Sequence, residues 1–277
     1  MRIAFTHAFC WPEVRRGAER FIQELGAALA RRGHEVTILS AGYEPVDSTL
    51  DGVRTVRLRR FRDDPLGHEV DFGRRILPRL LLGRYDVVHS MGRRDALTSI
   101  RAARAHPQRR TVITDLGLPS REYWDTMGKE GRVVEQVVEG IDVYGCMSEY
   151  ALGFLSSDYG RTDGVVTPGG VRLAEFQPAP KRADAPTLLL SGAYTEPRKG
   201  AATVLAALPA IAEQEPDVRL WLSGPGDPAE LLGSVPADVA ARVEVLGVGE
   251  AAEQHVRYGT AWATVLPSTH DSFGMAL

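Results

Sequence analysis

Short apolar runs alternate along this chain with longer segments in which apolar residues recur every three or four positions. The short runs predict buried strands and the longer segments predict helices, because these spacings match the two periods of regular structure. In the first 170 residues, strands are predicted at 3–5, 36–39, 53–58, 85–89, 111–114 and 141–147. Helices are predicted at 17–33, at 72–82 with a break near Pro78, at 120–140 and from Ser148 onward.

The same alternation resumes after a stretch rich in proline and charge, residues 178–186, which is typical of a linker. Strands are predicted beyond it at 188–190, 218–222, 243–246 and 261–266, and helices at 201–212 and 249–258. A chain of 277 residues is long enough for two domains. The pattern predicts an α/β protein with two Rossmann-like, doubly wound domains, residues 1–172 and 183–277.

The composition, 44% hydrophobic and 25% charged, is typical of a soluble globular protein. The longest apolar runs fall short of a membrane helix, and the chain opens directly on a strand-like Arg2–Phe5, so we expect no signal peptide. Cys10 and Cys146 lie far apart without metal-ligand spacing, which argues for a reducing compartment and against a zinc site. These features predict a cytoplasmic protein.

Charge is unevenly distributed between the two halves of the chain. Residues 1–170 hold 25 Lys and Arg against 23 Asp and Glu, and residues 171–277 hold 8 against 13. The first half contains a dense run of arginines: Arg54, Arg57, Arg59, Arg60 and Arg62. Such a run suggests contact with an anionic lipid surface, here the inner face of the membrane, or with an anionic acceptor. A solvated strand edge rich in arginine is the alternative.

The stretch between the strand at 188–190 and the helix at 201–212 favours phosphate binding. Gly192 ends the strand, and Arg198, Lys199 and Gly200 come directly before the helix. A helix start presents backbone N–H groups and a partial positive charge, to which Lys199 adds a point charge and Arg198 a forked donor. The alternative is a basic loop that contacts water alone.

This stretch resembles the donor-binding loop of the family 4 glycosyltransferases, which are retaining enzymes of the GT-B architecture. Its wording, Glu-Pro-Arg-Lys-Gly, a helix and then Pro-Asp-Val, is especially similar to the phosphatidylinositol mannosyltransferase branch. Other stretches similar to the family follow the same order: Arg-Gly-Ala-Glu-Arg from Arg16, Asp-Val-Val-His ending at His89, and Phe-Gln-Pro at 176–178. One departure is Ala193, which stands where the family has an arginine that contacts the donor diphosphate.

The resemblance implies site residues in the first half. Gly17 occupies the position at which the family's backbone comes close to the reaction centre, which makes it a candidate donor-binding residue. Arg16 replaces a neighbouring glycine and is a candidate residue of the acceptor side. His89 ends the strand that faces the acceptor in the family. Asp115, or Thr114 if the register slips by one, stands where a histidine commonly touches the donor sugar and the acceptor, which makes Asp115 a candidate catalytic residue. A turn or helix-capping aspartate is the alternative.

The last residues resemble the first half of the family's Glu-x7-Glu motif. Asp271 replaces the first glutamate, which hydrogen-bonds the donor sugar in the family, and is the second candidate catalytic residue. The residues after it, Ser272, Phe273, Gly274 and Met275, would bind the donor phosphate through backbone N–H groups. The second acid would fall beyond Leu277, so the resemblance implies a C-terminally truncated chain and an incomplete second domain.

The implied reaction moves a hexose from a UDP- or GDP-linked donor to an acceptor hydroxyl with retention of configuration. We expect no cofactor and no metal, because Lys199 and helix-end amides would neutralise the departing diphosphate. We expect a lipid-linked or polyanionic acceptor and no nucleic acid. The alternative is a degenerate GT-B protein that binds a nucleotide-sugar or a partner without turnover. A nicotinamide-dependent enzyme is disfavoured, because the glycines at 224 and 226 lack the rest of the dinucleotide fingerprint.

Overall fold

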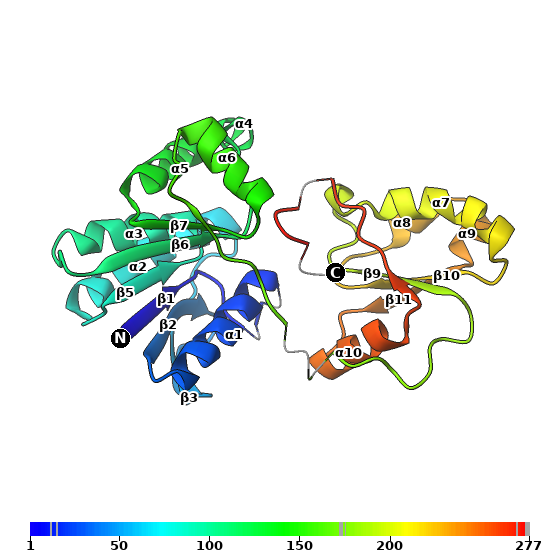
Figure 1. The fold of residues 1–277 in the computed structure, drawn as a ribbon, viewed down its shortest axis with the longest axis horizontal. Coiled ribbons are helices and arrows are strands. Elements are labelled where there is room, and N and C mark those ends of the chain that lie inside the picture. The colour runs from blue at the N-terminus through cyan, green and yellow to red at the C-terminus, as the bar shows by residue number, and fades with distance from the viewer. Residues whose placement is uncertain (12, 15, 172–173, 175, 270, 275–277) are drawn as a thin grey trace. The chain divides into compact units, whose positions relative to one another are not determined.

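The computed structural model describes residues 1–277 except 12, 15, 172–173, 175, 270 and 275–277. The chain forms two compact units, Met1–Gly169 and Gly170–Leu277. Each unit contains its own sheet of mostly parallel strands flanked by helices (Figure 1). The expected α/β class with two Rossmann-like units is therefore confirmed.

The first unit, in its described part, is built on an eight-stranded sheet in the order β3-β4-β2-β1-β5-β6-β7-β8. The strands are β1 (Arg2–Thr6), β2 (Glu35–Gly42), β3 (Val46–Leu50), β4 (Val53–Arg59), β5 (Val87–Ser90), β6 (Arg110–Asp115), β7 (Val143–Cys146) and β8 (Val165–Val166). The order reverses at β1, which pairs with β2 on one side and with β5 on the other, both in parallel. Such a switch point is where open α/β sheets bind ligands, at the carboxyl ends of the strands.

Helices cover both faces of this sheet. They are α1 (Gly17–Arg31), α2 (Pro65–Leu82), α3 (Arg93–Ala103), α4 (Arg121–Thr126), α5 (Lys129–Gly140) and α6 (Glu149–Tyr159). Successive residues of β1 face opposite sides of the sheet. Phe5 belongs to the same buried cluster as Ile22 of α1, whereas Ala4 belongs to the cluster that contains Phe72 of α2. The alternation along β1 thus fixes which helix lies on which face.

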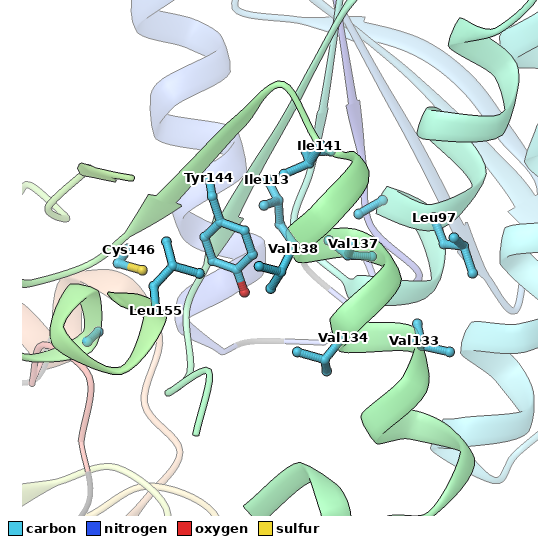
Figure 2. Close-up of a cluster of buried hydrophobic side chains, with 12 residues drawn as sticks. Leu97, Ile113, Val133, Val134, Val137, Val138, Ile141, Tyr144, Cys146 and Leu155 are labelled. Atoms are coloured by element: carbon cyan, nitrogen blue, oxygen red, sulfur yellow. The ribbon is translucent and has the colours of Figure 1, made fainter. Parts of the chain in front are cut away.

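A third cluster of the first unit lies beneath α5 and α6. Figure 2 shows the ring of Tyr144 in β7 beside Val137 and Val138 of α5, with Leu155 of α6 on its other side. Tyr144 has 0% exposure, so its ring is fully enclosed. Enclosure of the ring fixes the direction in which its hydroxyl extends.

Several sequence-based expectations in this unit need correction. The break near Pro78 is wrong, because α2 continues through this residue while Phe72, Ile76 and Leu80 bury one of its faces. This helix also begins earlier than expected, at Pro65, where the Asp64 side chain accepts from the Gly67 N–H.

The helical stretch expected at 120–140 divides into α4 and α5 at Gly128, whose φ is 56°. A missed strand, β3, pairs antiparallel with β4 through a turn in which Asp51 and Gly52 both have positive φ. Asp-Gly is the usual sequence for such a hairpin turn, so this signal was present and overlooked.

Among its described residues, the second unit carries a four-stranded parallel sheet in the order β11-β10-β9-β12. Its strands are β9 (Thr187–Ser191), β10 (Arg219–Ser223), β11 (Val243–Gly247) and β12 (Ala263–Thr264). Its helical segments are η1 (Pro197–Lys199), α7 (Ala201–Gln214), α8 (Ala229–Gly233), α9 (Ala237–Ala240) and α10 (Ala251–Thr260). Leu205 and Leu208 of α7 pack with Leu190, Leu220 and Leu222 of the sheet.

The stretch that we expected to be a linker lies in the second unit. The N–H groups of Ala179 and Ala183 donate to the carbonyls of Gly259 and Thr260, at the end of α10. Backbone hydrogen bonds therefore fix residues 178–186 against a helix.

Candidate functional site

The loop between β9 and α7, residues 192–200, lies at the carboxyl end of the second sheet and is shaped by glycines. Gly192 has a φ of 132° and Gly224, after β10, has a φ of 145°. A Cβ on Gly224 would lie 1.9 Å from the carbonyl oxygen of Gly192, so the turns after β9 and β10 touch through bare backbone. This contact places the N-terminal end of α7 beside the ends of β9 and β10.

Lys199 and Asp271 meet at this end of the sheet. The Lys199 ammonium lies 2.7 Å from Oδ2 of Asp271, and the Thr269 N–H donates to the Arg198 carbonyl at 3.0 Å. Gly200 follows with a φ of 73° and caps the start of α7, and a Cβ there would lie 2.4 Å from the Pro267 carbonyl oxygen. The structure thus brings together a cation and a carboxylate that the sequence predicted separately.

The other residues predicted to bind the donor occupy several environments. Arg198 pairs with Glu196 at 2.7 Å and is about half exposed. Ser272 is buried, Phe273 is exposed, and Gly274 has a φ of 76°. Met275 lies outside the described residues. Their donor-binding roles remain predictions.

An arginine of α10 braces the carboxyl ends of β10 and β11. Arg257 donates to the Ser223 hydroxyl at 2.8 Å and to the carbonyls of Gly247 and Leu246 at 2.9 and 3.0 Å. Gln254 lies 3.0 Å from the same hydroxyl. These contacts fix the ends of β10 and β11, and the turn at Gly224 follows the end of β10.

In the first unit, Asp115 is the last residue of β6 and is buried in a polar network. Its Oδ2 accepts from Arg93 at 2.6 Å and from the Tyr144 hydroxyl at 2.8 Å, and its Oδ1 accepts from the Gly117 N–H at 3.0 Å. Burial and the charge of Asp115 hold the pKa of Tyr144 well above its usual range, so the hydroxyl is a neutral donor. The catalytic role predicted for Asp115 stays a prediction.

Arg16 and Gly17 lie at the start of α1. Gly17 is its first residue, and the Arg16 guanidinium contacts Glu19 at 3.0 Å and stacks over the Phe9 ring at 4.7 Å. Glu19 is 2% exposed and also accepts from His7 at 3.2 Å. Burial alone would raise the pKa of Glu19, but the hydrogen bond and charges of His7 and Arg16 outweigh it and lower the pKa.

His89 lies within the sheet on the Phe5 side. Its Nε2 lies 2.8 Å from the Thr114 hydroxyl, and its ring lies 5.0 Å from that of Phe5. Burial lowers the pKa of His89 to about 4, so the ring is neutral near pH 7. The acceptor-side role predicted for His89 remains a prediction.

Thr6 and Asp95 form a second buried polar contact at the carboxyl ends of β1 and β5. The Thr6 hydroxyl donates to Asp95 at 2.6 Å and lies 2.8 Å from the Ser90 hydroxyl. Burial raises the pKa of Asp95 to about 6. The switch point of the first sheet therefore holds a group that titrates near neutral pH.

Both thiols are buried and unreactive. Burial raises the pKa of Cys10 to about 11 and that of Cys146 to about 12, so neither is a thiolate nucleophile near pH 7. In the described part of the chain, no three His, Cys, Asp or Glu side chains gather as metal ligands would. Within the same residues, no helix has the length and apolarity needed to cross a bilayer.

The arginine run is largely paired. Arg54 pairs with Asp47 at 2.7 Å, and Arg57 donates to the Glu44 carbonyl at 2.7 Å. Arg60 donates to the carbonyls of its own loop, and Arg62 pairs with Asp64 at 3.2 Å. Carboxylates thus offset the charges of Arg54 and Arg62, whereas carbonyl acceptors leave the charge of Arg60 in place.

The fold and the two carboxyl-end sites define a protein of the GT-B class. The family described as Glycosyltransferase Family 4 matches residues 15–175, and that described as Glycosyl transferases group 1 matches residues 185–277. The first match covers more than half of the chain. The chain belongs to glycosyltransferase family 4.

Two mycobacterial relatives are named phosphatidyl-myo-inositol mannosyltransferase. The protein of Mycolicibacterium smegmatis is 27% identical over 263 residues, covering 89% of this chain and 64% of its own length. That of Mycobacterium tuberculosis is 27% identical over 293 aligned positions, covering all of this chain and 74% of its own length. The chain thus spans about two thirds to three quarters of the length of these relatives.

Solved structures share the fold. A sucrose-phosphate synthase from Thermosynechococcus elongatus matches with a TM-score of 0.82 and 22% identity, over 99% of this chain and 77% of its own. Anabaena Alr3699/HepE, in complex with UDP and glucose, matches with a TM-score of 0.73 and 14% identity, over 100% and 77% of the two chains. At these identities the likeness shows the GT-B fold.

Sequence reasoning missed the partners of Asp115. Arg93 and Tyr144 come from different elements, α3 and β7, and their contact with β6 depends on tertiary packing. A weak signal was available for Arg93, which comes four residues after the strand predicted at 85–89, close to the strand end where ligand-binding residues concentrate. Tyr144, inside an apolar run, gave no such signal.

Proposed function

We propose that the protein transfers a hexosyl group from a UDP- or GDP-linked sugar to an acceptor hydroxyl with retention of configuration. The observation that carries this proposal is the Lys199–Asp271 pair at the N-terminal end of α7. Membership in glycosyltransferase family 4 supports it, as do relatives whose names describe mannosyl transfer.

In this mechanism the second unit holds the donor. The ammonium of Lys199 and the N-terminal end of α7 stabilise the negative charge that develops on the departing diphosphate. The Asp271 carboxylate accepts a hydrogen bond from a hydroxyl of the donor sugar and so orients the ring. Arg198 and the backbone of residues 272–275 complete the phosphate contacts. Neither a resident cofactor nor a metal ion is required, because these groups carry the charge.

Calorimetric titration of the full-length protein with UDP, GDP and their hexose conjugates tests this proposal. One nucleotide should bind, and Lys199→Ala should weaken its binding at least tenfold, because a charge-assisted contact contributes roughly 1.5–3 kcal/mol. Lys181→Ala is the matched control, since Lys181 forms an exposed pair with Asp184 in the same unit. Absence of nucleotide binding, or equal binding by Lys199→Ala, would contradict the proposal.

The acceptor that we propose is a lipid-linked polyol. The names of both mycobacterial relatives describe transfer to phosphatidyl-myo-inositol, and the first unit offers Arg16 and His89 on the side predicted to face the acceptor. Two apolar side chains are exposed beside the arginine run, Phe61 at 67% and Leu66 at 50%. Apolar tips next to cationic side chains suit peripheral contact with an anionic membrane.

Cosedimentation with vesicles tests the membrane contact. The protein should bind vesicles that contain anionic lipid, and binding should weaken as salt rises, because the charges involved are exposed. Phe61→Ser with Leu66→Ser should reduce binding, whereas Leu82→Ser should not, although Leu82 is 85% exposed at the other end of α2. Equal binding to neutral and anionic vesicles would argue against the contact.

A further inference from the structure

Arg93 is held on two sides at the carboxyl end of the first sheet. It is the first residue of α3, and its η2 nitrogen donates to Oδ2 of Asp115 at 2.6 Å. Its guanidinium lies 3.9 Å from the centroid of the Trp124 ring, which is itself anchored by a hydrogen bond from Nε1 to the Leu118 carbonyl. An ion pair and a cation–π contact together fix the plane of the guanidinium.

The Asp115 carboxylate is already fully engaged. Arg93 and Tyr144 share its Oδ2, the Gly117 N–H contacts its Oδ1, and the residue is 3% exposed. A group so enclosed has little surface left to offer a substrate. Its effect on chemistry would pass through Arg93, the charged partner that it orients.

Arg93, by contrast, has donors to spare. An arginine carries five N–H donors, and among the described residues only one of those of Arg93 has a hydrogen-bond acceptor, the Asp115 carboxylate. Its Nε–H is buried and has no acceptor in that part of the chain. A buried N–H without an acceptor is costly, which points to an oxygen atom supplied by a ligand or by water. The side chain is 18% exposed, so its outer edge can be reached from solvent.

The surrounding charge decides what kind of oxygen fits. Asp115 balances the charge of Arg93, and the carboxyl group of Glu69 lies close enough to act on Arg93 electrostatically. Burial raises the pKa of Glu69 above its usual range. A second full anion would be repelled here, whereas a hydroxyl group can accept from Arg93 and exchange hydrogen bonds with a carboxyl group.

We propose that Arg93 binds a hydroxyl oxygen of a neutral polyol ring and that Asp115 is the positioning residue that orients it. The inference rests on the proposed glycosyl transfer, in which the polyol would be the acceptor. It gives Asp115 a role different from the catalytic one predicted from the sequence. The polyol comes either as a free sugar or inositol or as the head group of a lipid.

Titration of the full-length protein with free myo-inositol and with glucose tests the inference, with NMR detection of the Arg93 Nε–H resonance. The polyol should shift this resonance, and Arg93→Lys and Asp115→Asn should each weaken polyol binding about tenfold or more. The double variant should be no weaker than the weaker single variant, because both substitutions remove one function. Arg94→Lys is the control, since Arg94 is the next residue of α3 and pairs with Glu130.

Vesicles that contain phosphatidylinositol form a second arm, which separates the two sources of polyol. A resonance shift with these vesicles and none with the free rings assigns the site to a lipid head group. A resonance that neither arm shifts, an Arg93→Lys variant that binds like the wild type, or fully additive losses would overturn the inference. The shift of the Arg93 Nε–H resonance is measured on the wild type, so it tests the inference even if a variant fails to fold. The nucleotide titration is separate, so failure of the donor proposal is recognised independently.

Discussion

The ammonium of Lys199 lies 2.7 Å from Oδ2 of Asp271, a residue 72 positions later in the chain. The two side chains are 15% and 24% exposed, so the pair is shielded but accessible to a ligand. Asp271 thus neutralises, in the unliganded protein, the cation that we propose for the donor diphosphate. A diphosphate must compete with this carboxylate for Lys199, or share the ammonium with it.

Removing the Asp271 charge should therefore strengthen nucleotide binding and slow transfer. We expect Asp271→Asn to bind UDP or GDP about three- to tenfold more tightly, as expected for loss of a partly exposed competing charge. Transfer should fall at least tenfold, because an amide is a weaker acceptor for the sugar hydroxyl than a carboxylate. Calorimetry measures nucleotide binding, and initial rates measure transfer. Asp184→Asn is the control, because Asp184 forms an exposed pair with Lys181. Weaker nucleotide binding by Asp271→Asn would contradict this account.

Gly224→Ala should disrupt the turns that shape the second unit's site. The new Cβ would lie 1.9 Å from the Gly192 carbonyl oxygen, at a φ of 145° that L side chains rarely adopt. We expect a loss of about 2 kcal/mol or more in the free energy of unfolding, with loss of nucleotide binding. Gly233→Ala is the control, because a Cβ at that helical position meets nothing within 4 Å. Urea unfolding of both variants would show equal stabilities if the clash were easily relieved.

Asp95 should make stability fall as pH rises from about 4 to above 6. Burial raises its pKa to about 6 in the folded protein, above the usual value for an unfolded chain, so the folded state binds the proton more tightly. The resulting destabilisation is absent below the unfolded pKa and complete above the folded one, and is on the order of 3 kcal/mol. As pH rises through this window, the wild type should lose unfolding free energy that Asp95→Asn keeps. The variant should therefore become more stable relative to the wild type. A pH-independent difference would contradict the prediction.

Asp142 should show the opposite pH dependence. Burial raises its pKa, but hydrogen bonds from the Thr111 backbone and side chain and from Arg110 outweigh burial and lower the pKa. The stability that these contacts contribute is present above the unfolded pKa and is lost as pH falls through the lowered folded pKa. Asp142→Asn should thus cost most near pH 7 and least in acid. Opposite slopes for the two variants would assign each effect to its own carboxyl group.

Arg109 should be critical for the first unit although it lies outside the candidate site. It is 4% exposed and donates three hydrogen bonds to backbone carbonyls. The acceptors are Leu80 in the last turn of α2, and Gly83 and Tyr85, which follow the helix. Arg109→Met leaves these carbonyls without their donor and should cost about 3 kcal/mol in unfolding free energy. Arg104→Met, at the exposed end of α3, should change it by less than about 0.5 kcal/mol. Chemical denaturation followed by circular dichroism compares the two.

Much of the fold was predictable because its buried strands are short apolar runs. Such runs can be recognised in the sequence without knowing which elements pack against them. Lys199 and Asp271 were found because both lie in motifs whose order follows the family. The hairpin of β3 was missed because this strand lacks an apolar run and is mostly exposed, so its signal lay in the Asp51–Gly52 turn. The contact between Arg93 and Asp115 was out of reach, because it depends on how α3 docks beside β6.

The low reactivity of the thiols of Cys10 and Cys146 makes the protein convenient for site-specific labelling. With pKa values of about 11 and 12, Cys10 and Cys146 carry almost no thiolate at pH 7.5, and both are buried. A cysteine introduced at an exposed position, one in each unit, should therefore react with maleimide dyes while the native thiols stay intact. A fluorophore pair attached in this way would report, by energy transfer, whether nucleotide binding changes the separation of the two units.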